Sequence, residues 1–201
     1  MNPKARKLLE NTIYPDLENG RPNWDLHHTK AVVRYMESIL ETHPELALDP
    51  EVMIPAAMAH DWGYAGLFRK GQPVSLAQNK DKKAEHMVLG AQKIEELLNN
   101  ETFDYLTNRQ KERIVHLVSV HDKLTELKDT DELVLMEADT LGATDINGLK
   151  PTHSYQEYLQ WLDNTTANRI TRFRTNYSKQ KIKQLLLERA RHYKQIPRKL
   201  P

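Results

Sequence analysis

Nine histidines and no cysteine define the chemistry that this 201-residue chain can offer. Without cysteine it can form no disulfide, no zinc–thiolate site, no iron–sulfur cluster and no thiolate nucleophile. Any metal centre must therefore combine imidazole nitrogens with carboxylate oxygens. Such a ligand set suits Mn, Fe, Co, Ni or Zn, and it also allows Mg. Which histidines point into the fold depends on the helices that carry them.

These helices follow from the apolar spacing, because no segment shows the two-residue alternation of a strand. The chain is predicted to be all-α, a compact helical bundle with additional C-terminal helices. Thr107 and Gln110 are placed to form a capping box. The residues before 25 are read as a loop that carries Pro15, Gly20 and Pro22. The predicted helices span about 25–42, 50–60, 76–98, 107–121, 130–142, 154–176 and 178–193.

Helical phase separates inward from outward histidines. His28 shares its face with Val32 and Ile39, whereas the neighbouring His27 aligns with Arg34. Three further histidines follow apolar residues at helical spacing, and two aspartates lie near the inner ends of helices. These residues are His60, His86, His121, Asp61 and Asp139.

A shared metal accounts for this group better than separate partners do. Taken singly, each inward histidine can also be a core residue bonded to a carbonyl. An inward carboxylate, however, needs a partner, since an isolated buried charge costs several kcal/mol. Asp61 has two oxygens and can bridge two ions. One ion would take His28, His60, Asp61 and Asp139, and a second would add His86 and His121.

Five segments carry these residues along the chain. They are DLHHTKAV (25–32), AMAHDWG (57–63), KAEHMVLGA (83–91), SVHD (119–122) and MEADTLGA (136–143). In this order they resemble the HD-domain superfamily of metal-dependent phosphohydrolases, in particular its small stand-alone bacterial members. The order His, His-Asp, His, His, Asp is similar to that of bacterial HD-type dinucleoside tetraphosphate hydrolases. It is also similar to that of HD-fold di-iron oxygenases such as myo-inositol oxygenase.

The resemblance covers about residues 24–145 and implies a phosphohydrolase that binds one or two divalent ions. Its substrate is expected to be a small phosphate ester or a nucleotide, attacked by metal-activated water. Asp61, Lys83 and Lys123 are the predicted catalytic residues. Arg69 and Lys70, together with Lys83, are the predicted contacts to substrate phosphate, although each of these cations also fits an ordinary surface role.

The same residues are compatible with two other functions. An HD-fold di-iron oxygenase would use the same six ligands, so that only the metal and the consumption of dioxygen would distinguish it. A non-catalytic nucleotide-binding sensor would keep the fold without turnover. No ligand is missing from the pattern, which favours an enzyme.

Length and charge indicate the domain organisation and the kind of partner to expect. The chain is predicted to form a single domain, residues 1–201, with its core at about 24–145 and a basic helical extension at about 154–201. Residues 169–201 hold eleven Lys or Arg and one acid. We expect this face to be solvated or docked on the acidic body, and nucleic acid is not an expected partner. No membrane segment or signal peptide is recognised, so the protein is expected in the cytoplasm, and a homodimer stays open.

Overall fold

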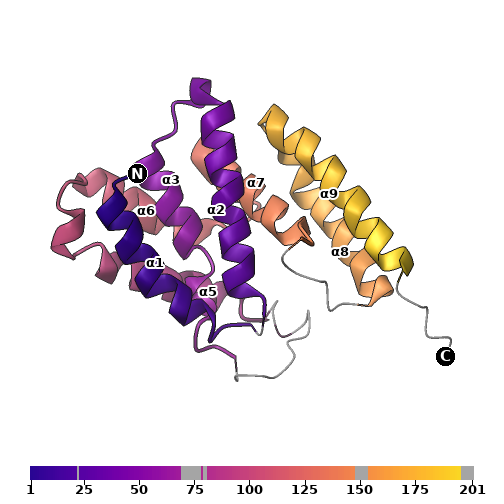
Figure 1. The fold of residues 1–201 in the computed structure, drawn as a ribbon, viewed down its shortest axis with the longest axis horizontal. Coiled ribbons are helices and arrows are strands. Elements are labelled where there is room, and N and C mark those ends of the chain that lie inside the picture. Colours follow the sequence, from indigo (N-terminus) through magenta and orange to yellow (C-terminus); the bar gives the residue numbers. More distant parts are fainter. Residues whose placement is uncertain (22, 69–77, 79–80, 148–153, 196–201) are drawn as a thin grey trace.

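The computed structural model describes residues 1–21, 23–68, 78, 81–147 and 154–195, and in this part every regular element is helical (Figure 1). The predicted all-α fold is confirmed. The α-helices are α1 (Pro3–Leu17), α2 (Asp25–Thr42), α3 (Pro50–Ala59), α5 (Lys83–Leu97), α6 (Asn108–Val120), α7 (Thr130–Thr144), α8 (Tyr155–Asn168) and α9 (Asn176–Gln195). Four 3-10 turns join them: η1 (Pro44–Leu46), η2 (Trp62–Tyr64), η3 (Glu101–Phe103) and η4 (Ile170–Arg172).

The core forms around α2, which packs along α7 on one side and against α3 on another (Figure 1). α6 packs against both α3 and α5, and η2 packs against α5. Fully buried side chains on the inner face of α2 include Val32, Met36 and Ile39, which repeat at helical spacing. This packing brings the C-terminal end of α3 to the middle of the bundle, where the His-Asp pair lies.

Most predicted boundaries agree with the structure because strong local signals set them. The helix predicted at 25–42 is α2, residue for residue. The capping box of Thr107 and Gln110 is confirmed at the start of α6. Asp49 accepts a hydrogen bond from the backbone N–H of Glu51 at the start of α3. The first residues of the helix predicted at 76–98 fall partly outside the described residues, and α5 covers the rest.

The loop predicted before residue 25 is wrong for its first part, because α1 occupies Pro3–Leu17 and contains Pro15. Asn2 caps this helix, accepting hydrogen bonds from the N–H groups of Lys4 and Ala5. One apolar residue per turn points into the bundle and is buried: Ala5, Leu9, Ile13 and Leu17. A stripe only one residue wide between charged neighbours is a weak signal in sequence.

The single helix predicted at 154–176 is also wrong. α8 ends at Asn168, η4 follows, and α9 begins at Asn176. The cause is tertiary: the buried carboxylate of Glu137, on α7, accepts hydrogen bonds from the backbone N–H groups of Arg174 and Thr175 and from the Thr175 hydroxyl. An acceptor at that place fixes a new helix start.

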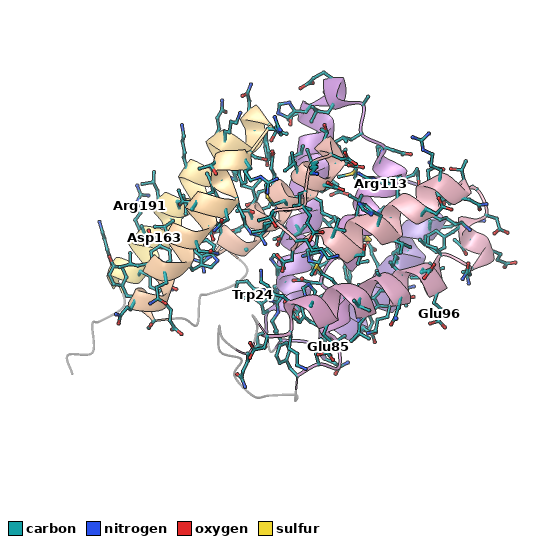
Figure 2. The ribbon with its side chains drawn as sticks, turned by 180° about the vertical axis from the view of Figure 1, so that it is seen from behind. Trp24, Glu85, Glu96, Arg113, Asp163 and Arg191 are labelled. Atoms are coloured by element: carbon teal, nitrogen blue, oxygen red, sulfur yellow. The ribbon has the colours of Figure 1, made fainter. Side chains whose placement is uncertain are left out.

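The basic C-terminal segment docks on the bundle through apolar contacts. In α9, Ile182 and Leu185 are buried where this helix packs against α7. The rings of Tyr158, on α8, and Tyr193, on α9, stack with centroids 4.3 Å apart. Figure 2 shows Asp163 and Arg191 on this α8–α9 pair, at the side of the molecule away from Arg113 and Glu96. Within the described residues, none of the helices is long and apolar enough to span a bilayer.

Glycine permits the close packing of η2 on α5. A Cβ atom at Gly63 would lie 1.8 Å from the backbone oxygen of His86 and 2.7 Å from the backbone nitrogen of Gly90. We therefore expect Gly63→Ala to lower the free energy of unfolding by about 1–3 kcal/mol or more, as overpacked sites do. Chemical denaturation would measure this. The control Val88→Ala, at an exposed site on α5, should change it by less than about 0.5 kcal/mol. An equal effect of both substitutions would contradict this account of Gly63.

Candidate metal centre

Three buried side chains from separate parts of the chain meet in a first cluster. Nε2 of His28, on α2, lies 3.1 Å from Nε2 of His60, which follows α3. The same nitrogen of His28 lies 3.1 Å from Oδ1 of Asp139, on α7, and Nε2 of His60 lies 3.8 Å from that oxygen. These three atoms face a common point and could hold one ion.

A second cluster lies beside the first. Nε2 of His86, on α5, lies 3.2 Å from Nε2 of His121, at the end of α6. Oδ1 of Asp61 lies 3.5 Å from the His86 nitrogen and 3.6 Å from the His121 nitrogen. These three groups could hold another ion.

Asp61 joins the two clusters. While its Oδ1 faces His86 and His121, its Oδ2 lies 3.5 Å from Nε2 of both His28 and His60. The six residues that the sequence singles out as ligands thus come together, with one carboxylate between the two groups. Ligand assignment itself remains a prediction until an ion is observed.

The spacing of these donor atoms suits transition-metal ions. Two ligands bound at about 2.1 Å to one ion lie about 3.0–3.4 Å apart at octahedral or tetrahedral angles. Most separations within the clusters fall in or near that range. Nδ1 of His60 and of His121 each donate to a backbone carbonyl, of Ala57 and Val118, over 2.8 Å. Each ring therefore turns the lone pair of its Nε2 toward the centre.

Local sequence explains how the ligands reach one place. Helical phase buries His28 and leaves His27 exposed, as predicted. Gly142 allows α7 to approach α2, since a Cβ there would lie 2.6 Å from Cγ2 of Val32 and 3.4 Å from Nδ1 of His28. The ring of Tyr64, in η2, stacks on that of His86 with centroids 4.0 Å apart. Close packing thus limits how far these imidazoles can turn.

The electrostatics favour the deprotonated form of three ligands, Asp61, His60 and His86. Burial alone would raise the pKa of Asp61, but His60 and Arg21 hold it well below the usual range. Burial lowers the pKa of His60, and it lowers that of His86 to about 4. At neutral pH these three groups are an ionised carboxylate and neutral imidazoles, which are the forms that bind a metal. Burial alone would lower the pKa of His121, but its hydrogen bond to Asp61 raises it above the ordinary value.

Two largely buried arginines also belong to the site, and neither of them was identified from the sequence. Nη2 of Arg21 lies 2.5 Å from Oδ2 of Asp61 and 2.5 Å from Oδ1 of Asp25. Nη1 of Arg169 donates to Oδ2 of Asp139 over 2.6 Å, and its Nη2 donates to Asp122. Neither arginine stands in a periodic segment that indicates its direction.

The four cations predicted to act on the substrate differ in where they lie relative to the clusters. Nζ of Lys83 lies 3.1 Å from Oδ2 of Asp122, the residue after His121, so that Lys83 stands at the edge of the second cluster. Lys123 is exposed, and the structure gives its side chain no contact with either cluster in the described part of the chain. Arg69 and Lys70 lie outside the described residues. The roles predicted for these four cations remain untested.

Fold and site together define an all-helical protein with two His/Asp clusters joined by one carboxylate. A family model, described as the HD domain, matches residues 25–167. Because this match covers more than half of the chain, the protein belongs to the HD-domain family, whose members are mostly metal-dependent hydrolases. The resemblance seen in the sequence is confirmed. Comparisons with curated proteins and with solved structures find no match.

Proposed function

We propose that this protein is a metal-dependent phosphohydrolase that acts on a small phosphate ester or a nucleotide. The observation that carries the proposal is the charge around the two clusters. In the described residues, the formal charges are four carboxylates, of Asp25, Asp61, Asp122 and Asp139, and three cations, of Arg21, Lys83 and Arg169. With the four imidazoles neutral, as metal ligands must be, two divalent ions would change this net charge from −1 to +3. Such a centre favours an anionic substrate.

The residues of the chain would act mainly by position. Bound divalent ions would lower the pKa of a water toward neutrality and neutralise charge on phosphoryl oxygens. Asp61 faces both clusters and would keep the two ions together. Burial lowers the pKa of its neighbours His60 and His86, so neither of these two imidazoles needs to lose a proton before it binds. Despite burial, the pKa of His121 is raised by Asp61, so this imidazole would lose its proton on binding. The carboxylate of Asp139 is held in its ionised form by Arg169, because the ion pair outweighs the effect of burial on its pKa.

Lys83 is the cation best placed to contact substrate. It stands one turn before His86, and its side chain is 40% exposed, whereas its partner Asp122 is almost covered. An ammonium group there can leave Asp122 for a phosphoryl oxygen at little cost, since it stays in contact with water. We propose that Lys83 binds substrate phosphate and does not take part in holding the metal.

Lys83→Met should therefore raise KM for the phosphorylated substrate by about tenfold, the effect of a loss of roughly 1.4 kcal/mol in binding. Metal content should stay unchanged. Lys82→Met is the matched control, because Lys82 precedes Lys83 in the chain and, among the described residues, its ammonium group pairs with exposed Glu85 and with neither cluster. Steady-state kinetics of both variants would measure KM and show whether Lys83 contributes to substrate binding. Equal KM values for Lys83→Met and the wild type would show that Lys83 does not bind substrate.

A single screen tests the reaction class. Protein purified without added metal would be loaded separately with Mn, Fe, Co, Ni and Mg. Phosphate release would be followed with p-nitrophenyl phosphate, mononucleotides and dinucleoside polyphosphates. Metal-dependent phosphate release would support the proposal. Dioxygen consumption by the iron-loaded protein without phosphate release would favour the oxygenase, and nucleotide binding without turnover would favour a sensor.

A further inference from the structure

Arg169 connects the C-terminal segment to the candidate metal centre. It follows the last residue of α8 and lies two positions beyond the end of the family match. Its backbone leaves the helical conformation, with φ −122° and ψ −61°, while its N–H still donates to the carbonyl of Thr165. The chain thus changes direction at the residue whose side chain turns into the bundle.

The guanidinium of Arg169 donates hydrogen bonds to two carboxylates, one that belongs to the first cluster and one that lies outside both clusters. Through Nη1 it holds Oδ2 of Asp139, whose other oxygen, Oδ1, faces His28 and His60. Through Nη2 it holds Asp122, which in turn pairs with Lys83. One side chain therefore fixes the oxygen of Asp139 that does not face the cluster.

This arrangement has a direct consequence for metal binding. A carboxylate with one oxygen tied to a rigid, planar donor presents the other in a fixed direction. Among the described residues, Asp139 is the carboxylate that belongs to the first cluster alone, since Asp61 also faces the second. Ligand-orienting partners of this kind commonly contribute 10–100-fold, roughly, to metal affinity.

We propose that Arg169 is a positioning residue for the first metal ion, which it serves by orienting Asp139. The C-terminal segment is then part of the metal centre and does more than cover the bundle. This inference rests on the metal centre of the proposed function but not on the reaction that the centre catalyses.

Arg172 offers a matched control for the docking of this segment. It stands three residues later, in η4, and donates to the backbone carbonyls of Leu124 and Leu127. Like Arg169, it forms hydrogen bonds from the η4 region to residues that follow α6. Unlike Arg169, it contacts none of the six candidate ligands. Loss of docking alone would affect both arginine variants in the same way.

The experiment measures Mn²⁺ affinity by calorimetry in two full-length backgrounds. His121→Ala disables the second cluster, so its remaining site is the first, and His28→Ala does the reverse. In the first background, Arg169→Ala should raise Kd by about 10–100-fold. Arg169→Lys, which keeps the charge but cannot bridge both carboxylates, should give a smaller increase. In the second background, Arg169→Ala should leave Kd nearly unchanged.

Arg172→Ala should lower the unfolding temperature without changing Kd in either background. The inference is overturned if Arg169→Ala binds Mn²⁺ as tightly as its parent in the first background. It is also overturned if Arg172→Ala weakens binding as much, because docking would then explain the effect. A wild-type protein that binds no Mn²⁺ would overturn the metal centre and this inference together, whereas a protein that binds two ions but hydrolyses nothing would leave the inference standing.

Discussion

Asp61→Asn should remove both metal ions and abolish hydrolysis. The two oxygens of Asp61 face different clusters, each 3.5–3.6 Å from two imidazole nitrogens. Asparagine keeps the size of the side chain but provides neither the charge nor a second oxygen. Because metal ions supply several kcal/mol of transition-state stabilisation, activity should fall about 10³-fold or more. Metal analysis and phosphate release under equal loading conditions would measure both effects.

His27→Ala and His116→Ala are the controls for this prediction. His27 is exposed beside buried His28, and His116 pairs with Glu132 at the surface of α6. Both variants should keep the full metal content and activity. An Asp61→Asn protein with two bound ions would contradict the bridging role of Asp61. Loss of metal in His27→Ala but not in His28→Ala would place the first ligand one residue earlier in the chain.

His86→Ala and His121→Ala should each reduce the metal content from two ions to one. Both imidazoles belong to the second cluster, where they face each other and Asp61. Removing either of them leaves the donor atoms of the first cluster in place. Hydrolysis should fall about 10³-fold if both ions stabilise charge in the transition state, since each tenfold corresponds to about 1.4 kcal/mol. Metal analysis of purified, reconstituted protein is the measurement.

A wild-type content near one ion, unchanged in both variants, would contradict this prediction. His86 and His121 would then be free to contact substrate phosphate, and the di-iron oxygenase would be excluded because it needs an iron pair. A content near two that is lost together with phosphatase activity, without dioxygen consumption, would support the hydrolase.

The parts of the site that lie on long amphipathic helices could be predicted from sequence. The choice of His28 over His27 depended only on helical phase in α2, and the structure buries the first and exposes the second. For His28, periodicity determines direction, because the apolar face of α2 must face the core. Asp139 could be singled out only as a carboxylate among apolar residues, since α7 is buried on nearly every side.

The parts that tertiary contacts determine could not be predicted. Arg21 stands in the short segment between α1 and α2, and its direction depends on Asp25 and Asp61. Arg169 stands where α8 ends, and that end depends on Glu137 of a different helix binding the start of α9. No pattern near either arginine indicates a buried partner. A charged residue beside a proline or within a basic segment reads as solvent-exposed.

Anomalous diffraction from crystals of the Mn²⁺-loaded protein tests the central claim most directly. We expect two peaks about 3.5–4 Å apart, the usual separation in two-metal sites. One should lie among His28, His60 and Asp139, the other between His86 and His121, with Asp61 bound to both. A single peak, or two peaks that Asp61 does not bridge, would contradict the account.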